Sequence, residues 1–209
     1  MKYEIVKTTT ELLGLYKPPM DLAVNKEMSK LDKHSIKFLS LSPFLTLSTS
    51  NSKGNMDCSP RGDYAGFVGV LDDYTIAIPD RPGNNRLDTL NNIIENPNVG
   101  LLVLVPGFNE CLRINGSAKI VTNLELLNRF EYKGKLPKSI ILVSITEVYF
   151  HCGKAITRSH LWKDESKVDR SIMPSLGRIL MNQIDSSKTD DEIQEVEKVI
   201  EDRLKTTLY

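Results

Sequence analysis

The chain has 209 residues, 40% of them hydrophobic, and its 27 Lys and Arg residues balance 27 Asp and Glu residues. This composition is typical of a globular protein with one domain, or with one domain and a helical extension, and the balanced charge gives no general attraction for nucleic acid. No apolar run approaches the about 20 residues of a membrane helix, and the N-terminal sequence does not resemble a secretory signal. Three widely spaced cysteines favour a reduced, cytoplasmic protein.

The hydrophobic pattern predicts a chain built mainly of β-strands joined by short turns. The expected strands are 44–50, 56–59, 75–78, 99–105, 111–121 and 139–150, with a further apolar run at 66–71 and a bulge at Gly116. The expected helices are 9–15, 31–39, 84–95, 123–132, 171–183 and 189–205, whereas 151–162 has the composition of an irregular segment.

About six antiparallel strands with one helix-containing crossover favour a small closed or partly closed barrel with flanking helices. The protein is therefore expected to be mainly β. We expect three parts: an N-terminal helical segment packed on the barrel (1–42), the barrel (43–165) and a C-terminal helical extension (166–209).

The segment Tyr74–Gly107 carries the most chemical information. A buried strand stops at Pro79, and a turn rich in Arg and Asn leads to a helix that we expect to begin near Asn84 or Asn85. The expected apolar stripe of this helix is Leu87, Leu90, Ile93 and Ile94. A second strand, 99–105, is almost continuously apolar, which predicts a strand covered on both faces.

The start of this helix is a candidate anion site. Unpaired amides and the helix dipole favour a phosphate or another anion there, and nearby arginines would strengthen the site. The alternative is an ordinary strand–helix turn, in which Arg81 and Arg86 are solvated or paired with Asp80 and Asp88.

Several motifs resemble those of a known family. They are NSKGNMDCSPRGD around the first hairpin, PDRPGNNRLDTL before the central helix, NP at the end of that helix, LRINGSA, and HCGKAITRS. The chain resembles the FMN-binding split barrel of the pyridoxamine 5′-phosphate oxidase-like flavoproteins over roughly residues 38–160. The resemblance implies bound FMN and a homodimer with FMN near the subunit interface. The balanced charge and the lack of a long apolar run predict no role for nucleic acid or a membrane.

The resemblance also implies which residues bind the cofactor. They are Arg61, Ile78, Pro79, Asp80, Asn84, Asn85, Arg86, Lys154 and Arg158. Arg61 would reach the phosphate or the ribityl chain, and Arg86 would hold the phosphate, helped by the amides of the two asparagines. The backbone of 78–80 would lie along the isoalloxazine ring. Lys154 and Arg158 would add positive charge at the cofactor. In one arrangement, they would reach the cofactor of the other subunit across a dimer interface.

Two departures from the family pattern limit the functional prediction. The typical Ser-Arg-Lys at the helix start is Asn-Asn-Arg here, and the C-terminal motif that grips pyridoxamine phosphate is absent. The resemblance therefore implies an FMN-dependent oxidoreductase of unknown substrate, with no assigned catalytic residue and no metal. The alternatives are a flavin-, haem- or deazaflavin-binding module without turnover, and a barrel that has lost its ligand.

Overall fold

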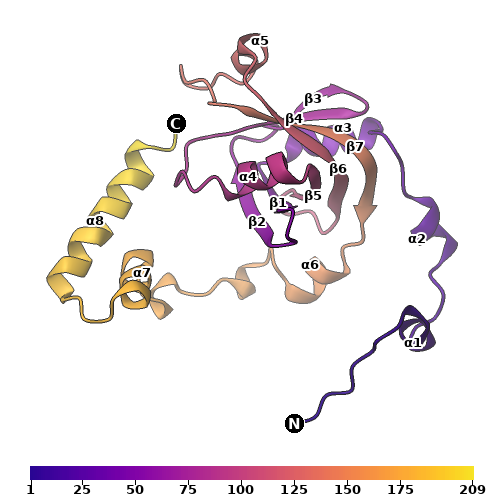
Figure 1. Cartoon of the computed structure of the whole chain (residues 1–209), viewed down its shortest axis with the longest axis horizontal. Coiled ribbons are helices and arrows are strands. Elements are labelled where there is room, and N and C mark those ends of the chain that lie inside the picture. The colour runs from indigo at the N-terminus through magenta and orange to yellow at the C-terminus, as the bar shows by residue number, and fades with distance from the viewer.

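The computed structural model describes residues 1–209, and its centre is a seven-stranded antiparallel sheet with helices around it (Figure 1). The strands are β1 (Phe44–Ser50), β2 (Met56–Gly62), β3 (Gly69–Asp72), β4 (Thr75–Pro79), β5 (Asn98–Leu104), β6 (Cys111–Val121) and β7 (Ile140–His151). Their order in the sheet is β2-β1-β5-β6-β7-β4-β3. The predicted mainly β fold is confirmed, with β3 as one strand more than expected.

The first hairpin follows from its turn residues. The amide of Asn51 donates to the carbonyl of Asn55 at 3.0 Å, and the Asn51 side chain accepts from the amides of Lys53 and Asn55, each at 3.0 Å. This turn sets the register of β1 against β2, in which Thr46 lies opposite Pro60. β2 lies at the free edge of the sheet, where a proline is tolerated.

Gly116 lies at the predicted bulge in β6, where the register against β7 shifts between Asn115 and Gly116. A Cβ atom on Gly116 would lie only 2.2 Å from the carbonyl oxygen of Ser144. Close approach of the neighbouring backbone therefore requires glycine at this point of the strand.

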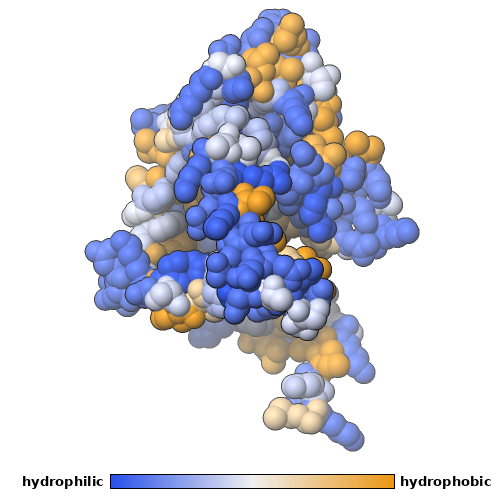
Figure 2. Space-filling model, turned by 90° about the vertical axis from the view of Figure 1, so that its left-hand side faces the viewer, coloured by the Kyte–Doolittle hydropathy of each residue, from blue (hydrophilic) through white to orange (hydrophobic).

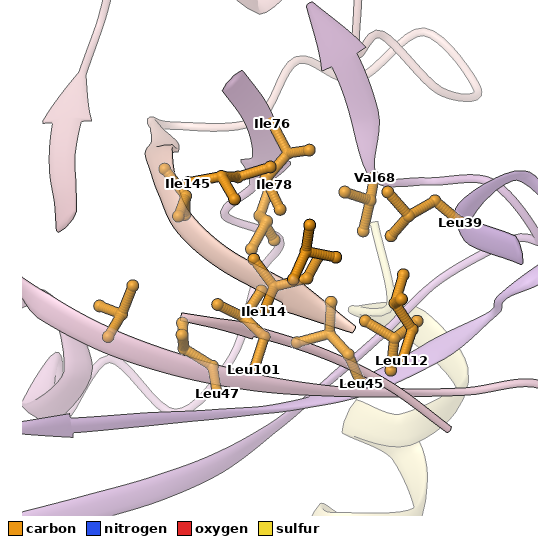
Figure 3. Close-up of a cluster of buried hydrophobic side chains, with 14 of the residues drawn as sticks. Leu39, Leu45, Leu47, Val68, Ile76, Ile78, Leu101, Leu112, Ile114 and Ile145 are labelled. Atoms are coloured by element: carbon orange, nitrogen blue, oxygen red, sulfur yellow. The ribbon is translucent and has the colours of Figure 1, made fainter. Parts of the chain in front are cut away.

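The core fills the inside of the curved sheet. Side chains from five of the strands point toward one another there, together with Leu39 from a helix and Val68 from the segment before β3 (Figure 3). A main cluster of 21 buried hydrophobic residues results, and a smaller cluster forms around Phe130. Strand alternation places the remaining residues of β1 and β5 on the outer face, where they are half-buried.

The helices are α1 (Thr9–Gly14), α2 (Asp21–Asn25), α3 (Lys33–Leu41), α4 (Asp88–Glu95), α5 (Leu124–Asn128), α6 (Lys154–Ser159), α7 (Leu176–Ile184) and α8 (Asp190–Thr206). Two short 3₁₀ turns lie at Asp164–Ser166 and Arg170–Ile172. No helix combines the length and the apolar character needed to cross a membrane.

Four helix predictions needed correction. The helix expected over 123–132 is shorter, because α5 ends at Asn128. α4 begins three to four residues later than expected, for reasons given below. α6 lies in the segment expected to be irregular, where its six residues are too few for a clear hydrophobic period. α7 begins after Pro174, because the hydroxyl of Ser175 accepts from the amide of Arg178 and caps the helix there.

The N-terminal segment divides into two parts. α1 and α2 contain no buried residues, whereas α3 buries Phe38 and Leu39 against the barrel. Only the second part of the segment 1–42 therefore packs on the barrel.

α7 and α8 pair with each other to one side of the barrel (Figure 1). A complete capping box fixes the start of α8, with Thr189 and Glu192 bonded reciprocally. The face of the molecule on this side is mainly hydrophilic, with scattered hydrophobic side chains (Figure 2).

Candidate functional site

Helix α4 is fixed to the first hairpin by polar contacts. The Thr89 hydroxyl, in a residue that is almost fully buried, donates to Asp57 at 2.6 Å and lies 2.9 Å from the Ser59 hydroxyl. One turn later, the Asn92 amide donates to Thr49 at 3.0 Å. These bonds place the loop 80–87 beside β2, on the side of the strand that carries Asp57, Ser59 and Arg61.

The loop 80–87 has an unusual backbone. Asn85 and Leu87 have φ values of 58° and 61°, in the left-handed region that residues with a side chain seldom adopt. This conformation interrupts a right-handed helix, so α4 begins at Asp88 and not at Asn84 or Asn85. The amides of Gly83, Asn84, Asn85 and Leu87 form no hydrogen bond within the chain. The predicted asparagine amides are therefore free, but they lie in the loop before the helix.

The motifs SPRGD and PDR form a double ion pair, which we define as Arg61–Asp80 and Arg81–Asp63. Nη1 of Arg61 donates to Oδ1 of Asp80 at 3.0 Å, and Nε of Arg81 donates to Oδ2 of Asp63 at 2.6 Å. The side chains are 18% and 16% exposed in the first pair, and 11% and 1% exposed in the second. Each motif supplies one acid and one base, so the double ion pair joins the end of β2 to the end of β4.

Two donors of the double ion pair have no acceptor. Nε of Arg61 and Nη2 of Arg81 are buried and form no hydrogen bond. Buried guanidinium donors are normally satisfied, and leaving one without a partner is unfavourable. An acceptor oxygen from a bound anion would satisfy Nε of Arg61. The residues present thus fit a phosphate-bearing cofactor at this point.

Arg86 is placed differently from Arg61. Its side chain is 73% exposed, and its Nε donates to Oδ2 of Asp88 at 2.8 Å. The hydrogen bond and the charge of Asp88 raise the pKa of Arg86. Of the two arginine–aspartate pairings considered from the sequence, Arg86–Asp88 is confirmed. The pairing of Arg81 with Asp80 is wrong, because Asp80 pairs with Arg61 and Arg81 pairs with Asp63.

The strand residues expected beside the flavin ring are buried. The Ile78 side chain belongs to the main core, and Pro79 lies opposite Ile140 of β7 at the end of β4. The strand thus runs one residue further than the proline suggested. Only the backbone and Asp80 at this strand end can face a ligand.

The structure does not bring Lys154 and Arg158 to the loop 80–87. Both lie on α6 and line a hollow of about 510 Å³, whose six lining residues include Asn109 and Glu110 but no residue of that loop. Within one chain, the expected site residues therefore form two groups.

An apolar hollow of about 710 Å³ adjoins α6 on the outer face of the sheet. Its lining includes Leu102, Leu104 and Arg113 from β5 and β6, and Ile156 from α6. The continuous apolar pattern of 99–105 predicted a strand covered on both faces, but in the single chain the outer side chains are half-buried.

Sequence reasoning did not identify a cluster of tyrosines next to the double ion pair. We call Tyr64, Tyr132 and Tyr209 the tyrosine cluster. Rings of Tyr64 and Tyr132 stack with centroids 4.8 Å apart, and the hydroxyl of Tyr209 donates to Asp63 at 2.6 Å. Tyr209 is 146 residues from Asp63, so no local sequence pattern could have indicated this contact.

The chain resembles several solved structures at low sequence identity, and this similarity concerns the fold alone. HupZ of Group A Streptococcus is 16% identical, with a TM-score of 0.48 over 57% of this chain and 94% of that chain. The FAD binding protein from Mycobacterium smegmatis is 15% identical, with a TM-score of 0.42 over 59% and 97%. An F420 reductase is 18% identical, with a TM-score of 0.43 over 56% and 98%. A comparison with curated proteins found no match.

A family model provides the assignment. The model described as pyridoxamine 5′-phosphate oxidase matches residues 31–152, which is more than half of the chain. The match runs from just before α3 to the end of β7, and it includes the double ion pair and the loop 80–87. The family resemblance is confirmed, and the chain belongs to the pyridoxamine 5′-phosphate oxidase family.

Proposed function

We propose that the protein binds FMN at the loop 80–87 and Arg61, and that it is an FMN-dependent oxidoreductase. The observation that carries this proposal is the set of free donors beside β2. Four loop amides form no hydrogen bond within the chain, and Nε of Arg61 is buried without a partner. Backbone amides in turns that include left-handed residues are a common form of anion site, and flavin phosphate is an anion of suitable chemistry.

Charge balance limits how a phosphate can be held. Arg61, Arg81 and Arg86 each have an aspartate partner already, so the three pairs carry no net charge. Arg86 and Asp88 are exposed, and exposed pairs contribute little to stability, so Arg86 can exchange Asp88 for phosphate at small cost. The buried pair Arg61–Asp80 is expected to stay intact and to donate to the phosphate through Nε of Arg61.

Bound FMN would supply hydride or electron transfer. The residues described here would bind and orient it: the loop and the arginines at the phosphate, and the backbone at the end of β4 beside the ring. No side chain stands out as an acid or base, so the substrate stays unassigned.

We also propose a homodimer. Leu102 and Leu104 are half-buried on the outer face of the sheet, where they line the apolar hollow beside α6. A second copy seated on this face would cover the apolar residues of β5 on both sides, as their sequence pattern predicts. It would also allow Lys154 and Arg158 of one copy to approach the FMN of the other.

Affinities for FMN and riboflavin test the phosphate assignment, because the two ligands differ only in the phosphate. We expect FMN to bind more tightly, and Arg86→Ala to weaken FMN binding by about tenfold while leaving riboflavin binding unchanged. Arg129→Ala, which removes an exposed arginine beside α5, is the matched control. Equal binding of the two flavins by the wild type would contradict the phosphate site.

Turnover is tested separately, with the FMN-loaded protein, a nicotinamide donor and an electron acceptor. Reduction of the flavin by the donor and its reoxidation by the acceptor would support an oxidoreductase. A protein that holds FMN but fails to exchange electrons with any donor would instead be a flavin-binding module.

A further inference from the structure

The tyrosine cluster has the geometry of an occupied aromatic binding site. The rings of Tyr64 and Tyr132 stack at an interplanar angle of 24°. The ring of Tyr209 lies against Tyr132 with centroids 4.7 Å apart and an angle of 48°. Tyr64 and Tyr132 belong to the barrel and its loops, whereas Tyr209 reaches them from beyond the end of α8. One ring of the three is thus supplied by a separate segment.

Charged groups fix the position of the Tyr209 ring. Its hydroxyl donates to Asp63, whose side chain is almost fully buried, and the guanidinium carbon of Arg81 lies 5.8 Å from its centroid. Nζ of Lys133 lies 5.1 Å from the same centroid. A buried carboxylate with cations near the ring suits a planar aromatic group that carries a hydroxyl.

Tyr209 does not satisfy this environment completely. Nη2 of Arg81 is buried and has no hydrogen-bond partner, although the hydroxyl of Tyr209 bonds to the carboxylate that Arg81 itself holds. A ring with an acceptor oxygen next to its hydroxyl would offer a partner for that donor, which a tyrosine side chain lacks.

Few contacts hold the segment that carries Tyr209 to the rest of the chain. It lies three residues beyond α8, and Ile193 is the buried residue of that helix. α8 packs chiefly against α7. Residues 207–209, none of which is buried, can therefore leave the tyrosine cluster without disturbing the core.

We propose that Tyr64, Tyr132, Asp63 and Arg81 form a binding site for a small planar aromatic ligand with a hydroxyl beside an acceptor oxygen, and that Tyr209 occupies this site in the free protein. The ligand and Tyr209 exclude each other. This site goes beyond the proposed FMN site, because its chemistry is a phenol on a carboxylate and requires no phosphate.

The test replaces the occupant and restores it as a free molecule. The full chain carrying Tyr209→Gly is titrated with p-cresol, which is the tyrosine side chain as a separate compound, and binding is followed by ligand-observed NMR. We expect p-cresol to bind the variant at least about tenfold more tightly than the wild type, because Tyr209 no longer competes. 4-Methylcatechol, with its additional oxygen, should bind more tightly than p-cresol, and toluene more weakly.

Two further variants make the result decisive. Tyr16→Gly removes an exposed tyrosine elsewhere and should bind p-cresol as the wild type does. Tyr209→Phe keeps the competing ring but loses its bond to Asp63, so its affinity for p-cresol should lie between the other two. Equal p-cresol affinity in the wild type, Tyr209→Phe and Tyr209→Gly would overturn the proposal, as would toluene binding as tightly as p-cresol.

Discussion

Removing the charge of Asp63 tests whether the double ion pair holds the barrel together. Asp63→Asn leaves the size of the side chain nearly unchanged, but Arg81 becomes a charge without a counter-ion. The Asp63 side chain is 1% exposed and the Arg81 side chain is 11% exposed, so the pair is buried. Removing one partner of such a buried pair typically costs about 3–5 kcal/mol. Because asparagine can still accept one hydrogen bond from Arg81, we expect a loss near the lower end, about 3 kcal/mol.

Urea unfolding of the variants measures this loss as a change in the free energy of unfolding. The matched control is Asp88→Asn, which breaks the exposed Arg86–Asp88 pair and should leave stability nearly unchanged. Adding Arg81→Met to Asp63→Asn removes the unpaired charge, so the double variant should recover much of the loss. The reasoning is refuted if Asp63→Asn is no more destabilising than Asp88→Asn, or if the double variant loses more stability than the single one.

Three further predictions concern stability. Gly116→Ala should lose about 1–3 kcal/mol in urea unfolding, because its Cβ would lie 2.2 Å from the Ser144 oxygen; Gly14→Ala, with open space around it, is the control, and equal effects would contradict the packing argument. Leu87→Asn should gain up to about 1 kcal/mol, because asparagine tolerates the left-handed backbone at φ 61°; a loss of stability would show that the Leu87 side chain has a packing role. The hydrogen bond to Asp63 raises the pKa of Tyr209 from 10.0 to about 12, so its contribution to stability is complete below pH 10 and lost as the pH rises through 12. The wild type should therefore exceed Tyr209→Phe in stability below pH 10, with the difference vanishing toward pH 12; a difference independent of pH would argue against this hydrogen bond.

Much of the barrel could be predicted because its signals are local. β1 and β6 have the bounds expected from alternation, and the hairpin turn and Gly116 bulge lie where turn residues and glycine indicated. The start of α4 could not be predicted in this way. Leu87 is a good helix former, and only the position of the loop against β2 explains why it adopts a left-handed backbone.

The apolar stripe of α4 was also predicted only in part. Leu90 and Ile93 pack on the core as the spacing predicts, but Leu87 and Ile94 are exposed, so the apolar stripe is narrower than expected. One face of the helix is occupied instead by polar bonds to the first hairpin, through Thr89 and Asn92. Hydrogen bonds between polar side chains produce no periodic hydrophobic pattern, so the sequence does not reveal them.

The candidate site could also be predicted only in part from the sequence. The motifs identified the two segments that meet, SPRGD and PDRPGNNR, but not that each arginine would pair with the acid of the other motif. That pairing depends on how the sheet curves, which alternation does not encode. The position of Tyr209 depends on the packing of two helices between it and the family motifs.

Pro60 in β2 restricts how copies of this protein can assemble. An unpaired edge strand is a template on which a second chain can continue the sheet, and such growth has no natural end. A proline lacks the amide that a continuous ladder needs, so strand addition at β2 is interrupted in its middle. The same proline that precedes Arg61 in the SPRGD motif thus also interrupts the row of backbone donors along this edge of the sheet.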